Sequence, residues 1–260
     1  MSNSIISDIA PFNLYGNIYF VGSSRVSVHF LDTECGLVLI DTGYPDMYDL
    51  IIQGIEVLGF DPKNICAIFH SHGHIDHYGC TLRLKELSGA KTYVSRIDND
   101  ILNGKKNLSF SDELKIKKEP FDCDVLIEDG DIFTFGKTSV RCRLAPGHTD
   151  GSLCFFITVD GSDIVAGMHG GIGTNTLAKD YLIKHNLPFS NRDIFREGLH
   201  ALAREEKVDL LLGNHPYQSD TVGKLEKVNS GQSVIDSTEW LKLLQEFEGR
   251  LDKRIREESK

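Results

Sequence analysis

The sequence predicts a single α/β domain over residues 1–260, made of two β-meanders that are each followed by helices. Three observations support this fold class. Short apolar runs bounded by turn residues occur in two groups, one before residue 70 and one between residues 131 and 166. Stretches with helical spacing follow each group. No repeat, low-complexity linker or change in composition divides the chain.

The first meander is expected to be antiparallel, with strands at residues 17–22, 26–31 and 37–40. A helix is predicted over 45–58, because Pro45 suits a first helical turn and Gly59 suits a helix end. A buried strand at 65–69 then leads into a histidine-rich stretch, which is followed by a helix over 80–87.

The second meander is expected after a strand at 91–95 and a polar segment, 103–124, that we predict to be a loop with a short strand. Its strands are predicted at 131–135, 139–144, 152–158 and 163–166, with a hairpin turn at Asp160-Gly161. A long glycine-containing connection over 169–188 follows.

Two helices and a strand complete the prediction. A helix over 190–206 begins at Ser190, with Asp193 in the capping-box position, and a strand at 208–212 follows it. The last helix, 236–255, has an apolar stripe that must pack on the body, and 250–260 is expected to be its solvated end. The stripe consists of Trp240, Leu243, Leu244, Phe247 and Leu251.

The composition excludes several functional classes. Charged residues make up 25% and hydrophobic residues 40% of the 260 positions, as in globular proteins. The formal net charge is −10, so we expect neither nucleic acid nor an anionic membrane as a partner. No apolar run is long enough to span a membrane and no signal peptide is visible, which predicts a cytoplasmic protein, or a periplasmic or secreted one whose leader was removed.

The six cysteines point to a reducing compartment. None forms a Cys-x-x-Cys pair, and several lie inside apolar runs, so we predict buried free thiols.

Ligand-type side chains gather just after the buried strand at 65–69. His72, His74, Asp76 and His77 fall within six positions, on a turn between a strand end and a helix start. Layered α/β folds usually build their sites at such junctions. Imidazole and carboxylate are the ligands that suit zinc. Two more histidines at strand ends, His148 and His215, bring the set to six ligands, enough for two ions.

These motifs resemble the metallo-β-lactamase superfamily. The resemblance rests on His-x-His-x-Asp-His at 72–77, Pro-Gly-His at 146–148, a late histidine after an apolar strand, and Asp-Thr-Gly at 41–43. The third subclass of metallo-β-lactamases is the most similar, since Asn214-His215-Pro216, Lys227 and the helix start at 236–240 occur in its order. The resemblance implies a four-layer αβ/βα sandwich.

The resemblance also implies two zinc ions per chain, although iron or manganese suits the same ligands. The first ion would be held by His72, His74 and His148, and the second by Asp76, His77 and His215. A hydroxide that bridges the metals would attack the carbonyl carbon of a small substrate, with Asp76 as the catalytic residue that orients it.

Three functional hypotheses follow. β-Lactam amide hydrolysis is the leading activity, and hydrolysis of another small cyclic ester or amide, as by a lactonase, is the alternative. A non-catalytic binding protein ranks last, because all six ligand residues are present.

One segment departs from the family pattern. Gly167-Met168-His169 stands where superfamily lactonases, glyoxalase-type thioesterases and flavodiiron proteins carry a bridging Asp near position 168, which counts against all three. The lactamase subclass has an Asp-Ser pair there that helps to hold the substrate carboxylate. The loop that follows offers possible replacements, namely Thr174, Asn175, Thr176 and Lys179.

The remaining polar candidates are expected to have supporting roles. Asp41 is interpreted as a buried acceptor beneath the site, and His70 as a packed or supporting histidine. Asp76 is a candidate helix N-cap as well as a ligand. Tyr78 is expected either to line the pocket or to pack, and His169 to be a substrate contact or a loop residue rather than an extra ligand. Structural or surface roles are expected for His29, His185 and His200.

Overall fold

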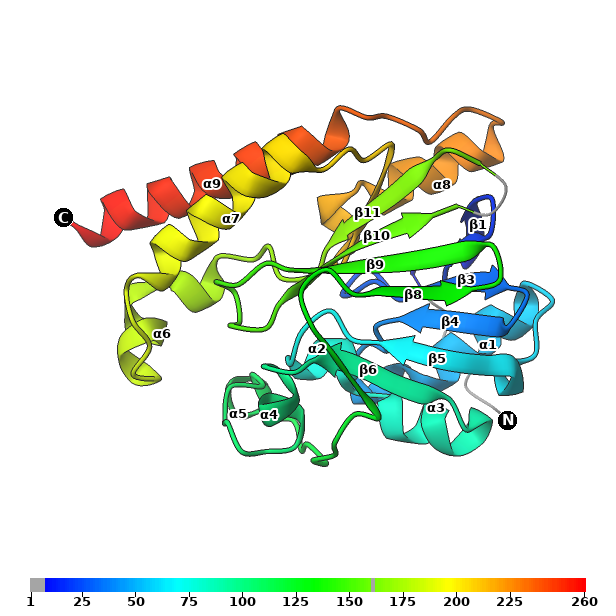
Figure 1. Ribbon diagram of the computed structural model, residues 1–260, viewed down its shortest axis with the longest axis horizontal. Coiled ribbons are helices and arrows are strands. Elements are labelled where there is room, and N and C mark those ends of the chain that lie inside the picture. Colours follow the sequence, from blue (N-terminus) through cyan, green and yellow to red (C-terminus); the bar gives the residue numbers. More distant parts are fainter. Residues whose placement is uncertain (1–7, 160–161) are drawn as a thin grey trace.

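Two β-sheets lie face to face and carry helices on both outer sides (Figure 1). The computed structural model describes residues 8–159 and 162–260. The apolar layer between the sheets contains Phe69 from one sheet and Phe155 from the other, whose ring centroids are 5.9 Å apart. The predicted four-layer αβ/βα sandwich is therefore confirmed.

The first sheet has seven strands in the order β1 to β7. Its bounds are β1 Phe12–Tyr15, β2 Ile18–Phe20, β3 His29–Thr33, β4 Gly36–Ile40, β5 Ile65–Phe69, β6 Lys91–Ser95 and β7 Val125–Ile127. Strands β1 to β4 are antiparallel, as predicted, while β4 to β7 are parallel. Parallel neighbours place their carboxyl ends at the same edge of the sheet.

The second sheet has five strands in the order β12-β11-β10-β9-β8. Its bounds are β8 Ile132–Phe135, β9 Thr138–Leu144, β10 Leu153–Thr158, β11 Val165–His169 and β12 Leu210–Gly213. All neighbours are antiparallel except β11 and β12. The predicted turn at Asp160-Gly161 lies outside the described residues, between the paired strands β10 and β11.

Helices α1 (Tyr48–Val57) and α3 (Thr81–Ser88) cover the outer face of the first sheet, where Ile51 and Leu84 join one apolar cluster with Phe30. The short 3₁₀ turns η1 (Pro45–Met47) and η2 (Pro62–Asn64) precede α1 and β5. Helix α3 ends as predicted, because Gly89 adopts a left-handed conformation with φ of +72°.

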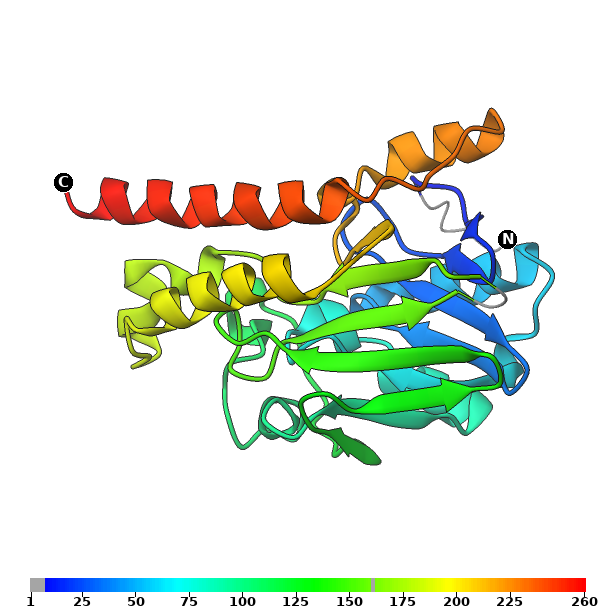
Figure 2. The same cartoon turned by 45° about the horizontal axis from the view of Figure 1, so that its top comes forward.

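Helices α7 (Asn191–Glu205) and α9 (Glu239–Glu258) cover the second sheet (Figure 2). The predicted stripe of α9 is confirmed, since its five apolar residues are buried and Trp240 packs edge-on against Phe156 of β10. Helix α9 begins three residues later than predicted, because the Asp236 carboxylate accepts a hydrogen bond from Thr238 N–H (2.9 Å) and holds a turn there.

The predicted capping box of α7 is wrong. Ser190 already has helical dihedral angles (φ −61°, ψ −16°), and its side chain accepts no capping hydrogen bond. The carboxylate of Asp193 instead forms an ion pair with Arg196 at 3.2 Å.

Several short elements were not predicted, because each is brief and polar and is stabilised by tertiary contacts. The segment 103–124 contains no strand; α4 (Asn99–Leu102) precedes it and α5 (Ser111–Leu114) lies in it. The connection 169–188 contains the end of β11, η3 (Asn175–Leu177) and α6 (Lys179–Lys184). Helix α2 (Ile75–Tyr78), η4 (Pro216–Gln218) and α8 (Thr221–Asn229) complete the described elements.

The strand predicted at 26–31 begins only at His29. Backbone bonds from Ser23 N–H to Val26 C=O (3.0 Å) and from Val21 N–H to Val28 C=O (2.9 Å) close a loop before it. All six thiols are free; four are buried as predicted, but Cys35 is exposed and Cys66 is half-buried. In the described residues no helix has the length and apolarity needed to span a membrane.

Candidate metal centre

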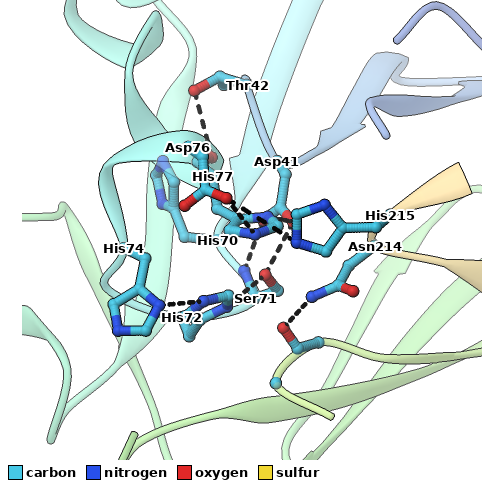
Figure 3. Close-up of polar contacts among 12 residues, drawn as sticks. Asp41, Thr42, His70, Ser71, His72, His74, Asp76, His77, Asn214 and His215 are labelled. Atoms are coloured by element: carbon cyan, nitrogen blue, oxygen red, sulfur yellow. Dashed lines mark hydrogen bonds and ion pairs between the residues drawn. The ribbon is translucent and has the colours of Figure 1, made fainter. Parts of the chain in front are cut away.

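The six predicted ligand side chains meet at one edge of the two sheets, in two adjacent groups. Figure 3 shows His72 and His74 beside Asp76, His77 and His215. The first four residues follow β5, His148 follows β9, and His215 follows β12. The rings of His72 and His77 connect the groups, with centroids 4.3 Å apart.

The first group consists of His72, His74 and His148, all of which are buried. Nδ1 of His74 lies 3.0 Å from Nε2 of His72 and 3.0 Å from Nε2 of His148. The second group has Asp76 at its centre. Its Oδ2 atom lies 3.5 Å from Nε2 of His77 and 3.8 Å from Nε2 of His215.

Outward hydrogen bonds orient four of the five imidazoles. Nδ1 of His77 donates to the Asp41 carboxylate (2.8 Å), and Nδ1 of His72 lies 3.1 Å from Ser71 Oγ. The other two bonds run from Nδ1 of His148 to Gly173 C=O (2.7 Å) and from Nδ1 of His215 to Arg25 C=O (2.8 Å). A proton on each Nδ1 leaves the Nε2 lone pair facing into its group, which is the arrangement expected of metal-binding histidines.

Burial keeps most of these rings neutral. It lowers the pKa of His148 to about 4, and it places the pKa values of His72 and His74 well below the usual range. The pKa of His215 is also lowered by burial. Burial acts in the same direction on His77, but the carboxylates of Asp76 and Asp41 outweigh it and raise the pKa of that ring. Neutral imidazole is the form that binds a metal.

The geometry fits zinc. Ligand nitrogens of a tetrahedral zinc site, with bonds of about 2.0–2.1 Å, lie about 3.3 Å apart. In the first group, Nδ1 of His74 is 3.0 Å from each of the other two ligand nitrogens, close to that spacing. The Nε2 atoms of His72 and His148 both face Nδ1 of His74 with a lone pair. A single proton on that Nδ1 can bond only one of them, so the group has more lone pairs than protons. A cation removes that mismatch.

Two buried carboxylates hold the ligand loops in place. Asp41, predicted as a buried acceptor, accepts bonds from the Ser71 N–H and hydroxyl (2.7 Å each) and from His77, so it supports both groups. Asp98 was missed. Its carboxylate accepts bonds from Gly73 N–H (2.8 Å), Thr149 Oγ1 (2.7 Å) and Gly151 N–H (2.9 Å), and so joins the His72–His74 turn to the His148 loop. The sequence signal that could have identified Asp98 is its position just after the end of a predicted strand.

The remaining candidates have structural positions. Both ring nitrogens of His70 are engaged, Nδ1 with Tyr93 C=O and Nε2 with Thr81 Oγ1 (2.8 Å each), which confirms a packed histidine. Tyr78 packs near Phe121, with ring centroids 6.0 Å apart, and does not line the cavity at the two groups. The N-cap of α2 is His74, so the predicted capping role of Asp76 is wrong.

His169 is neither a loop residue nor part of either ligand group among the described residues. It is the buried last residue of β11, its ring faces Phe195, and it does not line the cavity. The three histidines expected to be structural or surface residues are so: His29 packs edge-on against Phe20, while His185 and His200 lie 3.0 and 2.7 Å from Glu113 and Glu248.

A cavity of about 380 Å³ opens over both groups. Aromatic side chains and two arginines of α9 form much of its wall: Tyr44, Phe110, Tyr217, Phe247, Arg250 and Arg254. Phe110 contacts the His74 ring, with centroids 4.7 Å apart, and stacks on Tyr181. The sequence had indicated a solvated helix end from residue 250; Arg250 is exposed as predicted, whereas Arg254 is half-buried, and both side chains line the cavity.

Solved structures share this fold over nearly the whole chain. BJP-1, a subclass B3 metallo-β-lactamase of Bradyrhizobium japonicum, matches with a TM-score of 0.87 and 25% identity, covering 97% of this chain and 96% of that one. The FEZ-1 metallo-β-lactamase of Legionella gormanii has the same fold, with a TM-score of 0.87, 24% identity and coverage of 97% and 98%.

Sequence comparison agrees with the structural likeness. A hydroxyacylglutathione hydrolase of Maricaulis maris is 29% identical over 138 residues, which are 53% of this chain and 44% of that enzyme. The family model of the metallo-β-lactamase superfamily matches residues 21–178, more than half of the chain. That fold implies a metal site, and the structure has two groups of side chains that could hold metal ions. The chain therefore belongs to the metallo-β-lactamase superfamily.

Proposed function

We propose that this protein is a dizinc hydrolase of small carbonyl compounds, with β-lactam amides as the leading substrate class. The observation that carries the proposal is the pair of three-ligand groups at the base of one cavity of about 380 Å³. A cavity of this size suits a single small-molecule substrate. The likeness to subclass B3 enzymes over 97% of the chain supports the choice of β-lactams.

Zinc at the two groups would supply a water of lowered pKa and a Lewis acid for the carbonyl oxygen. The chain's own residues have simpler tasks. Asp76 is the only carboxylate among the described residues that line the cavity. Its position beside His77 and His215 at the cavity suits it to orient the attacking water by accepting a hydrogen bond. Tyr44, Phe110 and Tyr217 provide apolar walls that limit access of other water.

Recognition of a β-lactam cannot use the polar pair of the lactamase subclass. A Cβ at Gly167 would lie 2.5 Å from Val208 Cγ2, so this position has no room for a side chain. Met168 is buried in the apolar layer between the sheets. Of the four replacements predicted on the next loop, Thr174 and Asn175 line the cavity, whereas Thr176 and Lys179 do not. We propose Thr174 and Asn175 as polar contacts to substrate.

A cyclic ester or a thioester is the second candidate substrate. Gly167 has no room for a side chain, so the polar pair of the lactamase subclass cannot form there. In addition, one relative is a hydroxyacylglutathione hydrolase. The core chemistry is the same for an amide and an ester carbonyl, so the cavity walls decide between them.

The test is hydrolysis by zinc-loaded protein whose metal content has been measured. We expect two zinc ions per chain and turnover of nitrocefin or a carbapenem, which an Asp76→Ala variant should lose almost completely. A lactone and thioester panel run in parallel decides the substrate class. Protein that binds two zinc ions and turns over none of these compounds contradicts the proposed activity.

A further inference from the structure

Helix α9 brings two arginines into the wall of the cavity. Phe247, Arg250 and Arg254 are spaced three and four residues apart and therefore share one helix face. The amino-terminal half of α9 packs on the second sheet through Trp240. Its carboxyl-terminal half continues beyond the strands, alongside α7 (Figure 2). This extension carries the positive charges to the edge of the sheets where the ligand groups lie.

Ion pairs with α7 fix the orientation of α9. Asp252 pairs with Arg196 of α7 at 2.7 Å, and Glu258 pairs with Arg192. Glu258 also accepts a hydrogen bond from Lys179 N–H at 2.9 Å. Because Asp252 and Glu258 are engaged by α7 and by the start of α6, the helix cannot easily rotate its arginines away from the cavity.

The two guanidinium groups have few partners in the described residues. Nε of Arg254 is buried and has no hydrogen-bond partner. The Arg254 side chain interacts electrostatically with Glu258, but that carboxylate is paired with Arg192. Arg250 lies over the Phe247 ring, 4.4 Å from the centroid, and forms an exposed ion pair with Glu246 at 2.5 Å. Exposed pairs of this kind contribute little and exchange readily.

The charges at the cavity are arranged for an anion. Asp76 is the only carboxylate in its described lining, and it belongs to a candidate ligand group. Around it, Arg250 and Arg254 are the only permanently charged cations, in a chain whose net charge is −10. A guanidinium group matches a carboxylate through two parallel hydrogen bonds, and stacking on aromatic rings pre-organises it.

We propose that Arg250 and Arg254 form a subsite that binds a carboxylate of the substrate while its carbonyl lies at the metal centre. The subsite takes the place of the polar pair that Gly167 and Met168 cannot provide. It rests on the proposed function and restricts it to acidic substrates, which include β-lactams with a ring carboxylate and exclude uncharged esters.

The test compares mercaptoalkanoic acids of increasing chain length with their methyl esters. A thiolate is a good zinc ligand, so both compounds anchor at zinc and differ only in the carboxylate. Affinities for zinc-loaded protein are measured by titration calorimetry. For the chain length that reaches α9, the acid should bind about tenfold more tightly than the ester, as expected for a hydrogen bond between charged groups.

Three variants make the test specific. The double variant R250A/R254A should lose the preference for the acid and leave the ester unaffected. R250K/R254K should retain part of the preference, because it keeps the charges but not the planar geometry. R256A removes one arginine from an exposed position of α9 that does not line the cavity, and it should behave as wild type.

The results separate the subsite from the proposed function. The ester's affinity reports the metal centre alone. Protein that binds acid and ester equally at every chain length overturns the subsite but leaves the metal centre intact. The subsite is also overturned if the double variant keeps the preference for the acid while circular dichroism shows that it is folded. Protein that binds neither thiol contradicts the metal centre, and with it the subsite.

Discussion

Replacing Asp98 with asparagine is expected to weaken the metal centre and to change the free energy of unfolding by an amount that depends on pH. The carboxylate is buried and accepts three hydrogen bonds from the two ligand loops. An amide has one acceptor oxygen, so in either orientation at least one backbone N–H, of Gly73 or of Gly151, faces the amide NH₂. A buried donor without a partner costs about 1–3 kcal/mol.

The lost charge acts in the opposite direction. Burial raises the pKa of Asp98 from 3.8 to about 6, against the effect of its hydrogen bonds. Because the folded pKa is above the unfolded value, the group's contribution to stability is present below pH 4 and is lost as the pH rises through 6. The loss approaches about 3 kcal/mol above pH 6. Asparagine does not titrate, so the variant escapes this loss.

The two effects predict a crossing of the stability curves. Near pH 4.5 the D98N variant should be less stable than wild type, and near pH 7.5 the difference should vanish or reverse, a relative change of about 2 kcal/mol. Zinc affinity should fall about 10–100-fold, because the amide cannot keep all the hydrogen bonds that tie the turn of His72 and His74 to the loop of His148.

Urea unfolding in chelator at both pH values measures the stabilities, and competition with a chromophoric chelator at pH 7.5 measures the zinc affinity. Asp122→Asn is the control, since this exposed acid accepts hydrogen bonds from Asn99 and Asn103, outside the two ligand loops. It should change stability by less than about 0.5 kcal/mol. A difference between D98N and wild type that does not depend on pH, or unchanged zinc affinity, would refute the reasoning.

Three other predictions concern the metal centre and the core. His215→Ala should reduce the zinc content from two ions per chain to one, measured by atomic emission, and a retained second ion would contradict the assignment of His215. Removing zinc should lower the melting temperature by roughly 10 °C, relative to protein in a free zinc concentration about a thousand times the Kd. An unchanged melting temperature would argue against a native metal site. Trp240→Ala should cost about 3–5 kcal/mol of unfolding free energy in urea, because the ring is fully buried against Phe156; a change below 1 kcal/mol would show that α9 packs less tightly.

Patterns within short stretches of sequence predicted the parts of this protein that local physics determines. The apolar runs of β4, β5 and β12 are short and buried, and each ends in polar residues, so both the strands and their functional ends were visible. The spacing of residues 72–77 placed four ligand-type side chains, three histidines and one aspartate, on one turn. The stripe of α9 followed from its helical period.

Elements that depend on distant contacts were not visible. Helices α5 and α6 have four and six residues, too few for helical propensity to stabilise them alone. The loop before β3 is closed partly by a bond from Ser27 N–H to Asn214 C=O, 3.0 Å long, across almost two hundred residues of chain. Nothing near Ser27 in the sequence indicates that partner.

The sequence by itself indicated which residues are candidate metal ligands, because residue type and spacing at a strand end are local properties. It also indicated the absence of the usual polar pair at Gly167-Met168. Only the tertiary structure decided how the ligands are held and what surrounds them. Asp98 joins two loops that are far apart in the chain, and Arg250 and Arg254 reach the cavity because α7 fixes the rotation of α9. Such positions depend on the packing of whole elements, which no local pattern encodes.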